Sequence, residues 1–134
     1  MRTEFFMPME NIPTTTHQQK KVTVKNGRKF FYEPAELKAA HSKLEAHLAQ
    51  HVPENKYNSA IRVVIKWCFK ASAKYPKGTW KTTTPDCDNL CKLFLDCCTD
   101  VGFWEDDKLI ASLVVEKFYS DITGIYVCIE ELVK

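Results

Sequence analysis

The sequence lacks the features that mark a membrane-embedded or exported protein. No apolar run approaches the ~20 residues that a membrane-spanning helix needs. The N-terminal stretch MRTEFFMPMENIP contains no long apolar segment and reaches an acidic residue at Glu4, so it does not resemble a signal peptide. We therefore expect a cytoplasmic protein.

The chain also lacks the Cys-x-x-Cys pairs that are typical of structural zinc sites, although it contains six cysteines. Its four histidines have no zinc-like spacing relative to those cysteines. In a cytoplasmic protein we expect the thiols to be reduced and most of them to pack as small apolar side chains. A zinc-linked or redox-linked cysteine protein is kept as an alternative hypothesis, although this pattern argues against it.

The 134 residues have the length and composition of one globular domain. The chain is 45% hydrophobic and 27% charged, and it shows no repeat or linker, so we assign residues 1–134 to a single domain. Its charge is segregated: residues 1–85 carry 15 Lys and Arg against 6 Asp and Glu, whereas residues 86–134 carry 4 against 11. This segregation is typical of a protein that binds a polyanion and holds a metal through carboxylates, although solvated surfaces can segregate by chance.

Hydrophobic periodicity and turn residues predict the order of secondary-structure elements. A short strand at 3–9 is followed by a hairpin around Asn26-Gly27 and a helix from Pro34 to about His51. The expected remaining elements are a strand at 60–71, a helix from Pro85 to about Asp100 with Thr84 as its N-cap, and strands at 109–119 and 125–132. This order predicts an α/β fold in which helices pack on a mixed β-sheet.

Basic residues gather at two places in the N-terminal two thirds of the chain. The hairpin carries one group, and the outward face of the strand at 60–71 continues into a second group in the next loop. Phosphate binding is one interpretation of these groups, and solvated surface lysines are the other. The candidate DNA-binding residues are Lys20, Lys21, Lys25, Arg28, Lys29, Arg62, Lys66, Lys70 and Lys81.

The stretch PDCDNLCK at residues 85–92 contains both carboxylates and thiols. On a helical wheel Cys87 and Cys91 lie beside the apolar arc, whereas Asp88 and Lys92 lie on the far side, toward which Asp86 can also point. Carboxylates at a helix N-terminus are common because the helix dipole stabilises them. A second acidic group, Glu105-Asp106-Asp107, follows the helix. If the chain doubles back there, three carboxylates converge, which is the ligand set of Mg²⁺ or Mn²⁺.

The segment PDCDNLCKLFLDCCTDVGFWEDDKLI resembles the signature region of the RusA family of Holliday junction resolvases, small homodimeric endonucleases of bacteria and their phages. The shared pattern is Asp-x-Asp-Asn-Leu-x-Lys, a helix, and then Gly-Phe-Trp-x-Asp-Asp before a strand. The positions that match are Asp86, Asp88, Asn89, Leu90, Lys92, Asp96, Gly102, Phe103, Trp104, Asp106 and Asp107.

The resemblance implies roles for four of these residues. Asp86, Asp88 and Asp107 are the expected catalytic carboxylates that hold Mg²⁺, and Lys92 is the basic residue beside them. Adjacent residues of a strand point to opposite faces, so only one of Asp106 and Asp107 can join the cluster, and the resemblance favours Asp107. Family members commonly have a basic residue before the first aspartate, where this chain has Pro85. The basic groups elsewhere are therefore expected to supply the phosphate contacts.

The implied function is resolution of four-way DNA junctions in recombination and repair by a symmetric homodimer that makes paired nicks. Water is expected to attack a backbone phosphorus while the metal stabilises the leaving 3′ oxygen, which gives 5′-phosphate and 3′-hydroxyl ends. Neither a membrane nor a small-molecule cofactor is implied. The alternative is a catalytically inactive protein of the same fold that binds branched DNA, and the intact aspartate set argues against it.

Overall fold

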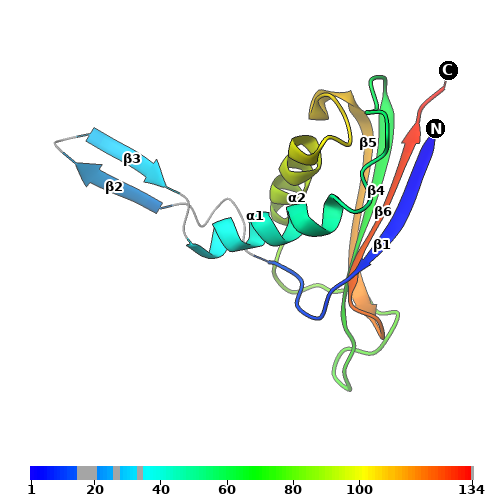
Figure 1. Ribbon diagram of the computed structural model, residues 1–134. Coiled ribbons are helices and arrows are strands. Elements are labelled where there is room, and N and C mark those ends of the chain that lie inside the picture. The colour runs from blue at the N-terminus through cyan, green and yellow to red at the C-terminus, as the bar shows by residue number, and fades with distance from the viewer. Residues whose placement is uncertain (15–20, 26–27, 33–34, 134) are drawn as a thin grey trace.

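The computed structural model describes residues 1–14, 21–25, 28–32 and 35–133, and of residues 21–25 and 28–32 only the backbone (Figure 1). Four strands form one sheet: β1 (Arg2–Pro8), β4 (Ile61–Lys70), β5 (Ile110–Ser120) and β6 (Gly124–Glu131). The helices are α1 (Ala35–Leu48) and α2 (Cys87–Val101), and a short 3₁₀ turn, η2 (Asp107–Leu109), precedes β5. The strands β2 (Lys21–Lys25) and β3 (Arg28–Tyr32) form a separate hairpin.

The four-stranded sheet is mixed, as predicted. Its order is β1-β6-β4-β5, with β4 and β5 parallel and the other two pairs antiparallel. A parallel pair needs a long crossover, and the chain makes it through α2. Both helices lie on one face of the sheet, so the architecture is a single two-layer α/β domain (Figure 1). No helix in the described part of the chain is long and apolar enough to cross a membrane.

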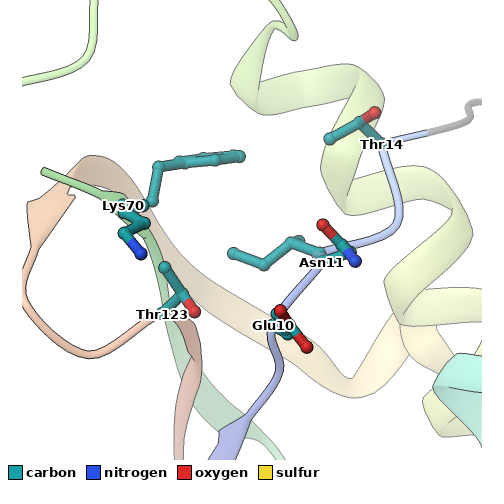
Figure 2. Close-up of a pocket in the computed structure, with 7 residues that line it drawn as sticks. Glu10, Asn11, Thr14, Lys70 and Thr123 are labelled. Carbon is teal, nitrogen blue, oxygen red and sulfur yellow. The ribbon is translucent and has the colours of Figure 1, made fainter. Parts of the chain in front are cut away.

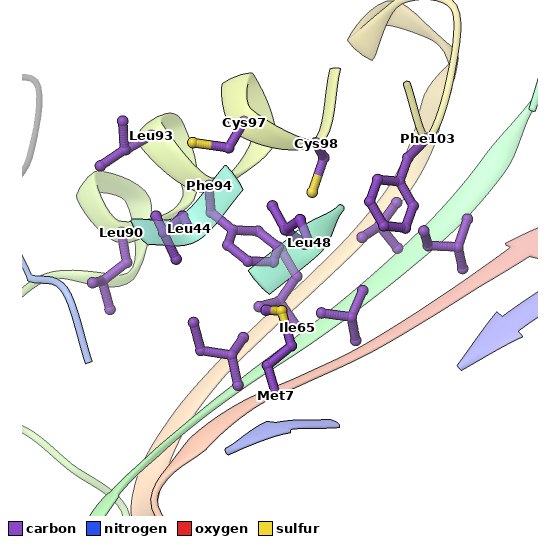
Figure 3. Packing of buried hydrophobic residues seen from close by; sticks show 14 of the residues in the cluster. Met7, Leu44, Leu48, Ile65, Leu90, Leu93, Phe94, Cys97, Cys98 and Phe103 are labelled. Atoms are coloured by element: carbon purple, nitrogen blue, oxygen red, sulfur yellow. The ribbon is translucent and has the colours of Figure 1, made fainter. Parts of the chain in front are cut away.

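The hydrophobic core lies between the two helices and the sheet (Figure 3). The alternation predicted for the strand at 60–71 is confirmed, because Ile61, Val63, Ile65 and Trp67 are all buried. Phe94 of α2 packs edge-on against Trp67, with ring centroids 5.5 Å apart. The sheet residues are covered by apolar side chains of both helices, among them Leu37, Leu44, Leu48, Leu90, Leu93 and Phe94.

The cysteines of α2 pack as apolar side chains, as predicted. Cys97 and Cys98 are almost completely buried, and Cys91 is nearly so. Burial raises the pKa of the Cys91 thiol to about 11, and it also raises the pKa of Cys98 well above its usual range. These thiols are therefore protonated at neutral pH, which fits packing rather than metal ligation or redox chemistry.

The outer face of the sheet is less basic than predicted. Arg62 and Lys66 do point away from the helices, but acidic residues on the neighbouring strands lie beside them. Lys66 Nζ lies 3.8 Å from Glu116 Oε1, and Arg62 is the cross-strand partner of Glu130. The periodicity of β4 alone does not reveal these acids, because they come from β5 and β6. The face carries mixed charge.

The start of α2 also differs from the prediction. The helix begins at Cys87 with Asp86 as its N-cap, so Thr84 and Pro85, joined by a cis peptide bond, lie outside it. The first helical hydrogen bond runs from the Leu90 N–H to the Asp86 carbonyl, at 3.1 Å. Lys117 Nζ donates to the carbonyl of Pro85. In a helix that began at Pro85, this carbonyl would accept a backbone N–H from the next turn instead. The predicted end is confirmed, because Gly102 is the left-handed C-cap with φ 98°.

The predicted hairpin is present, because β2 and β3 pair antiparallel. Lys25 pairs with Arg28 across residues 26–27, and the five pairs continue to Lys21 opposite Tyr32. In Figure 1 the hairpin lies beyond the N-terminal end of α1 and apart from the four-stranded sheet.

Candidate active site

Asp86 and Asp88 lie at the N-terminal end of α2 with their carboxylates exposed. Asp86 occupies the N-cap position with φ −74° and ψ 149°, yet its side chain makes no capping hydrogen bond. Asp88 is the acidic residue of the first turn. The helix dipole and the free N–H groups favour negative charge at this end. The Asp86 carboxylate, which does not cap the helix, is available to an external ligand.

Lysine side chains surround this end of the helix. Lys117 of β5 is half-buried and donates from Nζ to the carbonyls of Thr83 and Pro85, at 2.6 and 2.8 Å. Lys81 Nζ donates to Thr83 Oγ1 at 2.8 Å. The exposed Lys92 follows Asp88 by one helical turn. The two carboxylates therefore lie in a basic setting that suits a phosphate-bearing substrate.

The importance of Lys117 was missed from the sequence. In β5 it pairs in register with Trp67, whose side chain is buried, so Lys117 points to the helix side of the sheet. A lysine at an inward position of an alternating strand is the signal that identifies it, since an ammonium group is rarely placed there without a polar partner.

Asp107 lies at the opposite end of α2. The segment that leads to it is anchored at the C-terminal end, where Trp104 Nε1 donates to Thr99 Oγ1 at 2.7 Å. The Glu105 N–H donates to the carbonyl of Tyr57 at 3.1 Å. The 15 residues of α2 span ~22 Å at ~1.5 Å per residue, which separates Asp107 from Asp86 and Asp88.

Asp106 has a local structural role. It is the N-cap of η2, and its Oδ1 accepts a hydrogen bond from the Lys108 N–H at 2.8 Å. This hydrogen bond holds the pKa of the Asp106 carboxyl below its usual value. The carboxylate of Asp106 is thus engaged by the backbone, and both aspartates lie at a 3₁₀ turn rather than in the expected strand.

The predicted convergence of three carboxylates is not seen within a single chain among the described residues. Among the described residues, the side chains whose possible metal-ligand atoms come together are His41, Glu45 and Asp100, and that group includes none of the predicted aspartates. The strand β5 does run back beside α2, but Val115 rather than the start of the strand reaches the helix N-terminus. The Cys87 Sγ lies 4.0 Å from the Val115 carbonyl oxygen.

The predicted DNA-binding residues fall into separate parts of the molecule. The side chains of Lys21, Lys25, Arg28 and Lys29, and all of Lys20, lie outside what the structure describes. Lys70 lines a shallow pocket of about 240 Å³ together with Glu10, Asn11 and Phe69 (Figure 2). The Phe69 ring also lies beneath the Lys81 ammonium, with Nζ 4.9 Å from the ring centroid. The pocket therefore adjoins the basic group near Asp86.

Comparison with known proteins agrees with the motif. The family model described as Endodeoxyribonuclease RusA matches residues 10–130. A protein of Lactococcus phage r1t named "Crossover junction endodeoxyribonuclease rusA" is 28% identical over 134 residues, which cover 98% of this chain and all of the relative. "Uncharacterized protein YqaN" of Bacillus subtilis (strain 168) is 27% identical over 121 residues, or 82% of this chain and 84% of the relative. The family predicted from the motif is confirmed: the chain belongs to the RusA family of endodeoxyribonucleases.

Proposed function

We propose that this protein is a Mg²⁺-dependent endonuclease that resolves four-way DNA junctions by paired symmetric nicks during recombination and repair. The observation that carries the proposal is the pair of exposed carboxylates, Asp86 and Asp88, at a helix N-terminus lined by lysines. Family membership and the printed name of the phage relative support the same activity.

The residues fit a magnesium or manganese ion. Carboxylate oxygens are the ligands that these hard cations prefer, and the Asp86 carboxylate does not cap the helix. Asp86, Asp88 and Asp107 would hold the ion, which when bound stabilises charge on the scissile phosphate and on the leaving oxygen. Lys92, exposed one turn from Asp88, would contribute a further positive charge to the same phosphate.

The separation of Asp107 from the other two aspartates leads us to propose that the site is completed in a homodimer. β5 is an edge strand of the sheet. The C-terminal part of β5 is covered by the segment around residues 79–81. The Lys81 N–H donates to the Lys117 carbonyl, and the Tyr119 N–H donates to the Thr79 carbonyl. Residues 110–116 have no such cover among the described residues, and Leu113 and Val114 are 43% and 39% exposed. An exposed apolar edge of this kind favours pairing with another strand.

Antiparallel pairing of two β5 edges about a two-fold axis at Leu113 fits this edge. Ala111 then faces Val115 of the partner subunit and Ser112 faces Val114, so no like charges oppose each other. The start of each β5 would then lie beside the C-terminal half of the other β5. In that half, Val115 and Lys117 approach the N-terminus of α2. Asp107 of the partner subunit would thereby approach Asp86 and Asp88.

We assign phosphate binding first to the lysines beside Asp86, namely Lys81 and Lys92, and to the basic hairpin. Lys70 lies next to this group through the Phe69 pocket. Arg62 and Lys66 have acidic neighbours on the outer face and contribute less net charge to a DNA surface. Recognition of a junction through phosphates predicts binding that weakens as the salt concentration rises.

The experiment that tests the function uses a synthetic four-way junction labelled on each strand in turn, with Mg²⁺ or with EDTA. Metal-dependent nicks at symmetric positions in two strands of like polarity are the expected result. Tight binding without cleavage in either Mg²⁺ or Mn²⁺ would overturn the proposal and identify an inactive branched-DNA-binding protein.

A further inference from the structure

A second group of possible metal ligands lies between the two helices, at the end of α2 away from Asp86. His41 and Glu45 come from successive turns of α1, and Asp100 comes from the last turn of α2. The Nε2 atom of His41 lies 2.9 Å from Glu45 Oε1 and 3.2 Å from Asp100 Oδ2. One possible ligand atom from each residue lies within 4.8 Å of the other two. Asp100 is roughly 20 Å from Asp86 along the helix axis.

Two carboxylates converge on a single ring nitrogen, and that nitrogen carries at most one proton. One N–H donates well to one acceptor, so a proton satisfies one of the two carboxylates better than the other. A divalent cation bound to all three groups neutralises negative charge on both carboxylates at once. Ligand atoms bound at ~2.0–2.1 Å around a tetrahedral zinc ion lie roughly 3.3 Å apart, close to the two spacings observed.

The helix dipoles give an independent reason for a cation at this position. Glu45 and Asp100 both lie in the last turns of their helices, where the backbone carbonyls make the local potential negative. The last turn of α2 contains no basic residue, and that of α1 contains His47. Two carboxylates near two negative helix ends favour a positive charge between α1 and α2.

We propose that His41, Glu45 and Asp100 bind a divalent ion of the zinc class, with water completing the coordination, and that the ion ties α1 to α2. An imidazole with two carboxylates suits Zn²⁺ and Co²⁺, whereas Mg²⁺ prefers oxygen ligands alone. The site lies at the other end of α2 from Asp86 and Asp88 and does not depend on the nuclease function. Because both helices contribute ligands, binding stabilises their packing.

The test is thermal denaturation of the full-length protein, kept reduced, with Zn²⁺ or with Mg²⁺. The structure predicts a rise of several degrees in Tm with Zn²⁺ at a hundredfold excess over Kd and a smaller rise with Mg²⁺. His41→Gln, Glu45→Gln and Asp100→Asn are each expected to weaken Zn²⁺ binding at least tenfold in titration calorimetry. His47→Gln on the same helix and Asp88→Asn at the other site are the matched controls and should retain it.

Co²⁺ serves as a spectroscopic probe that separates this site from the cysteines. Ligation by nitrogen and oxygen gives ligand-field bands without a thiolate-to-cobalt charge-transfer band, and those bands should vanish in Glu45→Gln. A charge-transfer band, or Zn²⁺ affinity unchanged in both Glu45→Gln and Asp100→Asn, would overturn the proposal. Glu45 is partly exposed, so its variant is expected to fold even if His41→Gln does not.

Discussion

The ammonium group of Lys117 lies 2.8 Å from the carbonyl oxygen of Pro85, and it joins the edge of the sheet to the residue that precedes Asp86. A second hydrogen bond, to the Thr83 carbonyl at 2.6 Å, fixes the same segment. Lys117 thereby holds the backbone directly before Asp86, the N-cap of α2. We regard it as a positioning residue for the site.

Replacing Lys117 with Met is expected to slow junction cleavage at least tenfold while junction binding changes little, because Asp86 loses its fixed position. Loss of two charge-assisted hydrogen bonds should also lower the free energy of unfolding by about 1.5–3 kcal/mol. Single-turnover cleavage, a gel-shift assay and urea denaturation measure these effects. Lys77→Met is the control, since Lys77 is paired with Asp121 on the surface. Equal loss of binding and cleavage would show a direct contact with DNA instead.

Asp88→Asn is expected to retain junction binding and to abolish cutting, because the amide keeps the shape of the side chain but removes the charge that holds a cation. The readout is cleavage of the labelled junction alongside its affinity in EDTA. Asp121→Asn, a change of the same kind at an exposed surface pair, should leave both unaffected. Cutting at an unchanged rate by the Asp88 variant would remove Asp88 from the metal site.

A complementation experiment distinguishes a site built from two chains from one built within a single chain. Asp88→Asn and Asp107→Asn homodimers should both be inactive. In a mixed dimer, one site receives both substitutions and the other receives neither, so nicking of single strands should reappear after subunit exchange. If each site were formed by one chain, every mixed dimer would remain inactive.

Leu113→Lys is expected to convert the proposed dimer into a monomer, because it would place two like charges opposite each other on the two-fold axis. Light scattering after gel filtration measures the mass, and cleavage should fall together with the dimer fraction. Ile122→Lys is the matched control, since Ile122 is 65% exposed in the turn between β5 and β6. A dimer that survives the Leu113 change would place the interface elsewhere.

Phe94→Ala is expected to lower the free energy of unfolding by about 3–5 kcal/mol, because it removes a fully buried ring and leaves a cavity against Trp67. Phe94→Leu, which keeps most of the volume, should cost much less. Urea denaturation followed by Trp fluorescence gives both values. A loss for Phe94→Ala as small as that for Phe94→Leu would show that neighbouring side chains collapse into the space left by the ring.

The sequence predicts well what is decided by local periodicity. The buried alternation of β4, the apolar arc of α2 with its cysteines, and Gly102 as a helix end all follow from spacing and backbone preference. The family was likewise evident in a short motif, because Asp86, Asp88, Lys92 and Asp107 stand at characteristic intervals.

Features that depend on contacts between distant segments could not be predicted in this way. The carbonyl of Pro85, just before α2, is bonded by Lys117, which lies 32 residues further along the chain. Glu116 and Glu130 approach the basic side of β4 only because β5 and β6 flank it. The position of Asp107 depends on how Trp104 and Glu105 are held at the end of α2, and a motif does not contain that information.

The distance between the two ends of α2 has a consequence for how the cell controls such an enzyme. On the proposed arrangement a newly made chain has an incomplete set of catalytic groups and cannot damage DNA by itself. Nicking then begins only above the protein concentration at which two copies meet. Copy number would act as a threshold, and paired cuts would follow from the same assembly that creates the two sites.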